Sequence, residues 1–205
     1  QTLSDNGFLY VYNMIGGIMA WKDAGYPVYV KYSSIQMAIN NANAGQTIYV
    51  SSGIYYENLI VNKSLTLVGE NKYTTIIDAN GIGTVILVQA DNTSISSFTK
   101  RKSGCACGDH GGVNIENCQN VNITDNLITQ NGIGIRLNLT STIIAANNNI
   151  TNNDFSGFEL WNSSNNIISG NNIVNNSIGV RLESSENNTL RSNNMTNNKR
   201  HFSVW

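Results

Sequence analysis

The sequence predicts an all-β fold, a solenoid of stacked strands, because residues 113–205 repeat with a period of 22 or 23 residues. The repeats keep three apolar columns in phase from one turn to the next. These columns are Ile128, Ile150, Ile173 and Met195; Val113, Ile135, Phe158, Val180 and Phe202; and Ile115, Leu137, Leu160, Leu182 and Val204. A period in the low twenties, built from short alternating strands, is typical of a β-solenoid.

Two columns of asparagine run in step with the apolar columns. They are Asn126, Asn148, Asn171 and Asn193, and Asn131, Asn153, Asn176 and Asn198. Neighbouring turns lie about 4.8 Å apart, so stacked amides can donate and accept hydrogen bonds along the axis. Asparagine also tolerates the left-handed backbone that sharp corners require. A disordered low-complexity tract is the alternative, but disorder would not keep the apolar residues in register.

The first 30 residues have a different sequence pattern from the repeats. The run GFLYVYNMIGGIMAWKDAGYPV at residues 7–28 predicts a short strand, a Gly-Gly turn and an amphipathic helix that ends at Gly25. This run resembles the final strand and helix of rhodanese-like (sulfurtransferase) domains. The resemblance implies that residues 1–30 are the C-terminal remnant of such an α/β domain, whose nucleophilic cysteine would lie upstream of Gln1. The three cysteines of this chain do not match that position: Cys105, Cys107 and Cys118.

An amphipathic helix is predicted next, over residues 33–45. Ser33 or Ser34 can cap its start, and Gly45 can end it. Its apolar face consists of Ile35, Ala38, Ile39 and Ala42. The first turn of a solenoid exposes an apolar lumen and an unpaired strand edge, so we expect this N-terminal helix to cap them.

Short strands separated by Gly, Asn and Asp turns follow from Thr47 and predict about seven turns of solenoid. The segments SIQMAI, GQTIYVSSGIYYENLIVNKSLTLVGEN, TIIDANG and ADNTSISSFT resemble the NosD-type periplasmic copper-binding family and related β-helix repeats of carbohydrate-binding proteins and sugar hydrolases. The resemblance starts near residue 32 and defines a second domain at residues 31–205. It implies a right-handed single-stranded parallel β-helix of the pectin-lyase-like kind, and location in the periplasm or at the cell surface.

One irregular insertion, at residues 100–112, interrupts the repeats. It and the next strand bring five candidate ligands close together in sequence: Cys105, Cys107, Asp109, His110 and Cys118. Thiolate and imidazole groups at such short spacing could hold copper(I) or zinc. In an exported protein, three cysteines also suit one disulfide, either between Cys105 and Cys107 or involving Cys118. A loop with neither is the third alternative. The resemblance to NosD does not decide among them, because no metal ligand of the family can be matched to these positions.

Side chains between the apolar columns face outward, because successive residues of a strand point to opposite sides. One outward column is Asn114, Arg136, Glu159, Arg181 and Ser203, and the next is Glu116, Asn138, Trp161, Glu183 and Trp205. A carboxylate between two arginines predicts favourable cross-strand ion pairs. Exposed tryptophans beside carboxylates favour sugar binding, because their rings stack on apolar sugar surfaces, although isolated exposed aromatics are common. The candidate glycan-binding face comprises Arg136, Glu159, Trp161, Arg181, Glu183 and Trp205.

The sequence favours a protein without catalytic activity. A glycosidase needs two carboxyl groups about 5–9.5 Å apart, and acids are sparse in the repeats. Arg136 and Arg181 neutralise the surroundings of Glu159 instead of raising a carboxyl pKa. No Ser/His/Asp arrangement is visible in the sequence.

Composition and charge exclude several partners. The net charge is −1 and there is no basic run, which argues against nucleic acid and anionic membranes. No apolar run approaches the roughly 20 residues of a membrane span. No export signal is present in this chain, which opens with Gln rather than Met and so leaves open that such a segment is missing from it.

The final turn begins as KRHFSVW and then stops, which leaves the apolar lumen beneath Phe202 and Val204 uncapped. We therefore expect a truncated repeat domain that frays or self-associates end to end. The predicted function is a non-catalytic, extracytoplasmic module that binds a polysaccharide or surface glycan, or builds a cell-surface layer. The alternatives are NosD-like handling of copper through the Cys105–Cys118 loop, and a place within a larger sulfurtransferase-containing or polysaccharide-acting surface protein.

Overall fold

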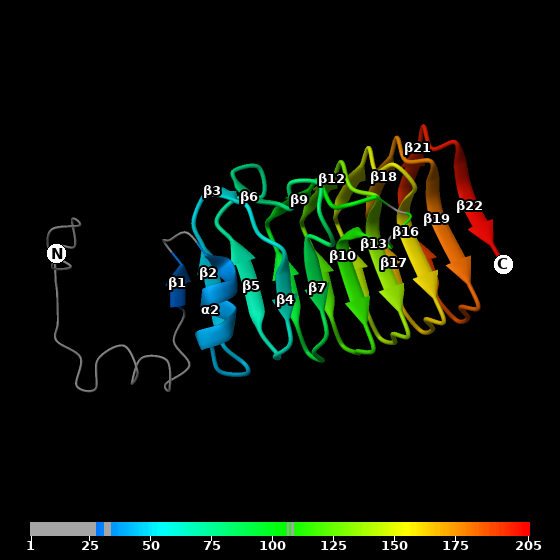
Figure 1. Cartoon of the computed structure of the whole chain (residues 1–205). Coiled ribbons are helices and arrows are strands. Elements are labelled where there is room, and N and C mark those ends of the chain that lie inside the picture. Colours follow the sequence, from blue (N-terminus) through cyan, green and yellow to red (C-terminus); the bar gives the residue numbers. More distant parts are fainter. Residues whose placement is uncertain (1–27, 31–33, 106, 108) are drawn as a thin grey trace, which may run out of the picture.

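The computed structural model describes residues 28–30, 34–105, 107 and 109–205. These residues form a right-handed parallel β-helix, in which neighbouring strands pair in parallel along the whole stack (Figure 1). The predicted all-β solenoid of about seven turns is confirmed, since two of the three sheets contain seven strands. Nearly all of the expected rhodanese-like remnant lies outside the described residues. Within those residues, no helix is both long and apolar enough to cross a membrane.

Each turn of the coil adds one strand to each of three sheets. Sheet 1 comprises β1 (Val28–Val30), β2 (Thr47–Val50), β5 (Thr66–Gly69), β8 (Ser94–Ser96), β11 (Asn122–Thr124), β14 (Ile144–Ala146), β17 (Ile167–Ser169) and β20 (Thr189–Arg191). Sheet 2 comprises β3 (Gly53–Tyr55), β6 (Thr75–Asp78), β9 (Thr99–Arg101), β12 (Leu127–Thr129), β15 (Asn149–Thr151), β18 (Asn172–Val174) and β21 (Asn194–Thr196). Sheet 3 comprises β4 (Leu59–Val61), β7 (Ile86–Val88), β10 (Gly111–Glu116), β13 (Ile133–Asn138), β16 (Ser156–Trp161), β19 (Ile178–Glu183) and β22 (Arg200–Val204).

The core lies in the lumen enclosed by the three sheets. Ile128 pairs with Ile150, and Ile150 with Ile173, and all three side chains are fully buried. Met195 continues this column in the last turn, where it packs against the core and is half-buried. The predicted inward column is therefore confirmed, and one-residue register slips are disfavoured because they would turn these side chains toward water.

The helix α2 (Ile35–Asn41) lies on the first turn at the N-terminal end of the solenoid (Figure 1). Its buried residues, Ile35 and Ile39, join the core, as predicted for a capping helix. Ser34 is the N-cap, and its hydroxyl accepts a hydrogen bond from the backbone of Met37 at 3.1 Å. The helix ends at Asn41, earlier than the predicted stop at Gly45.

Two charged side chains hold the ends of α2 and explain its length. The Glu57 carboxylate accepts hydrogen bonds from the backbone N–H groups of Ile35 and Gln36, at 2.7 and 2.9 Å. At the other end, the Lys63 ammonium donates to the carbonyls of Ile39, Asn40 and Ala42 at 3.2, 2.7 and 3.0 Å. Both charges complement the helix dipole and satisfy backbone groups that have no partner within the helix.

The asparagine columns form continuous hydrogen-bonded ladders inside the corners of the coil. The Asn148 Oδ1 accepts from both the backbone N–H and the Nδ2 of Asn126, at 3.0 and 3.1 Å. The Asn148 Nδ2 in turn donates to the Oδ1 of Asn171 at 3.0 Å, and to the carbonyl of Ile123 at 2.8 Å. The second column repeats this pattern from Asn131 to Asn198.

The first ladder starts at a buried lysine. Phe98 occupies the position that asparagine holds in later turns, so no preceding side-chain amide is present to donate to Asn126. The Lys100 amine fills this place, and its Nζ donates to the Asn126 Oδ1 at 2.6 Å. Lys100 is fully buried between Ile77 and Ile128 in register, and burial lowers the pKa of its amine well below the usual value.

Candidate glycan-binding site

A row of alternating charges crosses the outer face of sheet 3. Register places Glu159 on β16 between Arg136 on β13 and Arg181 on β19, as the sequence predicted. The Glu159 Oε1 lies 3.5 Å from the Arg136 Nε, and its Oε2 lies 3.3 Å from the Arg181 Nη1. Arg181 also contacts Glu183 on its own strand, with 2.7 Å between Nη2 and Oε2.

The loop between β9 and β10 adds a fifth charge to this row. The Asp109 Oδ2 lies 3.2 Å from the Arg136 Nη2, and the Asp109 backbone carbonyl accepts a hydrogen bond from the Asn114 Nδ2 at 2.9 Å. The row therefore reads Asp109, Arg136, Glu159, Arg181 and Glu183, and we call it the charge row. We expected its members on sheet 3 to face solvent. Arg136 and Glu159 are instead 6% and 2% exposed, because the charged neighbours and nearby rings cover them.

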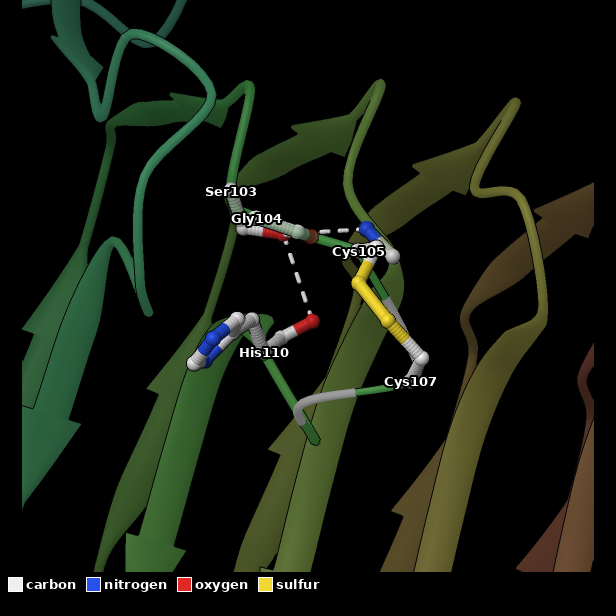
Figure 2. Close-up of a disulfide and its surroundings, with 6 residues drawn as sticks. Ser103, Gly104, Cys105, Cys107 and His110 are labelled. Carbon is white, nitrogen blue, oxygen red and sulfur yellow. Dashed lines mark hydrogen bonds between the residues drawn. A yellow bond between two sulfur atoms is a disulfide. The ribbon is translucent and has the colours of Figure 1, made fainter.

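The base of the loop is fixed to the solenoid by Ser103. Its hydroxyl donates to the carbonyl of His110 at 3.2 Å and accepts from the backbone N–H of Gly132 at 2.9 Å. Beyond Ser103, Cys105 and Cys107 form a disulfide (Figure 2). The loop is therefore short and cross-linked, and it leads directly from β9 into β10 of sheet 3.

Cys118 takes no part in this loop. It follows β10, whereas the loop precedes that strand, so the length of β10 separates them. Its thiol is buried and free, and contacts the carbonyls of Val88 and Glu116 at 3.4 and 3.0 Å. Burial raises the pKa of the Cys118 thiol to about 11, which keeps it protonated at neutral pH.

A pocket of about 240 Å³ lies between the loop and sheet 3. Its lining combines the disulfide, charged groups and apolar side chains: Cys107, Asp109, Ile133, Phe155, Glu159 and Arg181. The sequence identified the charged members, but it missed Ile133 and Phe155. Phe155 precedes β16 at a corner. The alternation of side chains along a strand therefore does not predict which way its ring points. Concave sites with apolar walls and a few polar groups are the usual form of ligand pockets.

Aromatic rings flank the charge row on the same face. The Arg136 guanidinium lies 5.6 Å from the centroid of the Trp161 ring, and the Arg181 guanidinium lies 5.6 Å from that of Phe155. Trp161 is 37% exposed, so part of its ring remains open to a ligand. Trp205 follows β22 and is 75% exposed, and its backbone bonds to Leu182 and Ser184 place it beside Glu183. The predicted column of Trp161, Glu183 and Trp205 is thus present.

A larger hollow of about 380 Å³ lies at the corner between sheets 2 and 3. Its lining is polar and consists of Asn152, Asn153, Asp154, Asn175, Asn176, Ser177, Asn197 and Lys199. No aromatic or apolar side chain belongs to that lining, so it lacks a surface for a sugar ring. The smaller pocket therefore provides the better candidate site.

The three parallel sheets around an aliphatic lumen define a right-handed parallel β-helix protein. The family described as "Periplasmic copper-binding protein (NosD)" matches residues 39–205. Because this match covers most of the chain, the protein belongs to the NosD family. No curated protein matches the sequence.

Two solved structures illustrate the fold. ORF18 of Geobacillus virus E2 aligns with a TM-score of 0.55 and 19% identity, over 83% of this chain and 37% of the viral chain. Pectin methylesterase from carrot aligns with a TM-score of 0.52 and 10% identity, over 85% of each chain. This chain thus spans about 37% of the length of the viral protein. At such low identity, the likeness shows the fold alone.

The loop as it stands does not fit copper, the metal in the family's description. Copper(I) favours thiolate ligands, and these must be free and deprotonated. Cys105 and Cys107 are joined to each other, and Cys118 is a buried, protonated thiol elsewhere. Throughout the part of the chain that the structure describes, no group of three or more His, Cys, Asp or Glu side chains is placed to hold a metal ion.

Proposed function

We propose that this chain is a non-catalytic, extracytoplasmic β-helix module that binds a glycan on the outer face of sheet 3. The observation that carries the proposal is the pocket beside the charge row, with Trp161 and Phe155 against its two arginines. Aromatic rings next to hydrogen-bonding groups suit sugars, which present apolar C–H faces and polar hydroxyls. The periplasmic description of the NosD family supports the extracytoplasmic location.

The charge row favours binding over catalysis. Both oxygens of Glu159 contact arginines and the residue is 2% exposed, so neither oxygen is free to contact a glycosidic bond. An acid catalyst needs a carboxyl group that reaches the oxygen of the glycosidic bond. Ordered charges that fix the position of neighbouring groups are instead suited to recognition.

Isothermal titration calorimetry with oligosaccharides tests the proposal. We expect saturable binding by the full chain, and about a tenfold weaker affinity in Trp161→Ala, since buried aromatic anchors contribute most strongly to binding. Tyr56→Ala is the matched control, because Tyr56 is also an exposed aromatic, at 68%, but precedes the first strand of sheet 3. Equal affinity of both variants for every sugar, or no binding at all, would contradict the proposal.

Metal handling is the second candidate, supported by the family's description and by the closeness of Cys105, Cys107, Asp109 and His110 in one loop. It requires the disulfide to be reduced, because only then are two thiols available. Metal analysis of protein prepared with and without reductant tests it. Copper bound at one equivalent in the reduced protein, and lost in Cys105→Ser, is the result that this candidate requires.

A further inference from the structure

We infer that the glycan bound on sheet 3 carries free amino groups, and that glycans with carboxylates are excluded. This inference rests on the proposed function of the same face and names its ligand class. It follows from how the charges in the charge row are already paired.

The charge row begins and ends with a carboxylate. Arg136 lies between Asp109 and Glu159, and Arg181 lies between Glu159 and Glu183. Three carboxylates face two guanidinium groups, so the row as a whole carries a charge of −1 at neutral pH. The site therefore attracts cations and repels anions before any direct contact is made.

Both arginines are already paired with carboxylates of the protein. Each one contacts two carboxylates of the protein and lies against an aromatic ring. A uronic acid would compete with Asp109, Glu159 or Glu183 for these arginines, and a displaced carboxylate would lose its partner. For Glu159, which is 2% exposed, the loss would leave a buried charge unpaired, which is strongly unfavourable.

The carboxylates of Asp109 and Glu183, at the two ends of the charge row, can each accept a further hydrogen bond. Asp109 uses Oδ2 for Arg136, and Glu183 uses Oε2 for Arg181. Among the described residues, the Oδ1 of Asp109 and the Oε1 of Glu183 accept no hydrogen bond. Their side chains are 56% and 29% exposed, so a ligand can reach both. An ammonium group is the donor that suits such oxygens best, because charge-assisted hydrogen bonds are stronger than neutral ones.

The pocket and the rings supply the sugar-binding part of the site. Asp109 and Glu159 line the pocket together with Ile133 and Phe155, so a charged and an apolar wall face the same space. Trp161 lies one outward position beyond Glu159 on β16, and Glu183 is its register partner on β19. A sugar ring over Trp161 therefore lies next to a carboxylate that can receive its amine.

Binding of three hexasaccharides to the full, oxidised chain tests the inference: a glucosamine hexamer, a glucose hexamer and a galacturonate hexamer. Calorimetry at low ionic strength should show about tenfold tighter binding of the glucosamine hexamer than of the glucose hexamer, as two exposed ion pairs allow. Galacturonate should bind most weakly. The preference for amine should shrink in about 0.5 M salt, where exposed charges are screened.

Two variants locate the effect. Glu183→Gln and Asp109→Asn should each weaken glucosamine binding by about three- to fivefold and change glucose binding less, so that the preference for glucosamine falls. Glu186→Gln is the matched control, because Glu186 is an exposed carboxylate in the same turn but outside the charge row. The two variants lie on different elements, so a local rearrangement in one does not affect the other.

The outcomes separate this inference from the proposed function. Equal binding of glucosamine and glucose overturns the inference and leaves glycan binding intact. Tighter binding of galacturonate also overturns it, because this face would then favour a carboxylate over an amine. Failure of all three hexasaccharides to bind contradicts glycan binding itself, and the inference with it.

Discussion

Asparagine pairs perform two separate tasks at several corners of the coil. The first residue of a pair adopts the left-handed backbone, as Asn147 and Asn152 do with φ of 57° and 55°. The second residue, Asn148 or Asn153, points inward and joins the ladder. The sequence predicted both roles but assigned them to asparagine in general. The structure divides them between neighbours, which explains why Asn-Asn pairs recur at the corners.

Removal of one ladder amide should destabilise the coil more than any exposed substitution. Asn148→Ala leaves the buried N–H of Asn126 and the carbonyl of Ile123 without their side-chain partners. We expect a loss of about 2–4 kcal/mol in the free energy of unfolding, measured by chemical denaturation. Asn149→Ala is the control, because Asn149 faces outward, and it should cost less than about 1 kcal/mol. Equal losses in the two variants would show that the ladder does not stabilise the coil.

Lys100 could not be placed from the sequence. It stands at the start of the irregular insertion at residues 100–112, where the repeat pattern is interrupted. In the structure it occupies the aliphatic column, because Phe98 leaves the ladder without a donor and the long lysine side chain can reach Asn126 from that column. The sequence around Lys100 does not show that a distant asparagine lacks a hydrogen-bond donor.

Lys100 should make the stability of the protein depend on pH. Burial lowers its pKa in the folded state, so between that pKa and the ordinary lysine value the unfolded chain binds more protons. The contribution of Lys100 to stability therefore rises as the pH increases from 7 toward 10. In Lys100→Met, this rise should be absent, and the protein should be more stable than wild type at pH 7. Thermal melts across this range test both expectations, and parallel pH profiles of the two proteins would contradict them.

At the scale of the element, local signals predicted the helix and the strands well. The sequence predicted the apolar face and the serine cap of α2, but it did not predict that the helix ends before Gly45. Its C-terminal carbonyls are satisfied by Lys63, which lies 21 residues after Ala42. Helix ends are uncertain from sequence whenever a distant side chain supplies the cap.

The loop between β9 and β10 shows the same limit. Its cysteines pointed to a disulfide or a metal site, and the structure has Cys105 paired with Cys107. Its contribution to the candidate site comes from Asp109, through an ion pair with Arg136. These two residues lie a full turn apart, and the repeat pattern does not extend through the insertion. Only the folded loop brings them together.

For the whole molecule, the period of the repeats determined the architecture. Apolar residues at equal spacing predicted the lumen, and residues between them predicted the charged column on sheet 3. Periodicity gives direction but not burial, which is why Arg136 and Glu159 were expected in solvent and are covered instead. The corner residue Phe155 and the loop residue Asp109 complete the site from outside the strands, where periodicity carries no information.

The most direct test of glycan binding on sheet 3 is hydrogen–deuterium exchange, with and without the hexasaccharide that binds most tightly. We predict added protection in the loop at residues 103–110, in β16 and in β19, with sheets 1 and 2 unchanged. Protection confined to the asparagine-lined corner at residues 152–154 and 175–177, or spread over sheets 1 and 2, would contradict the assignment of the site.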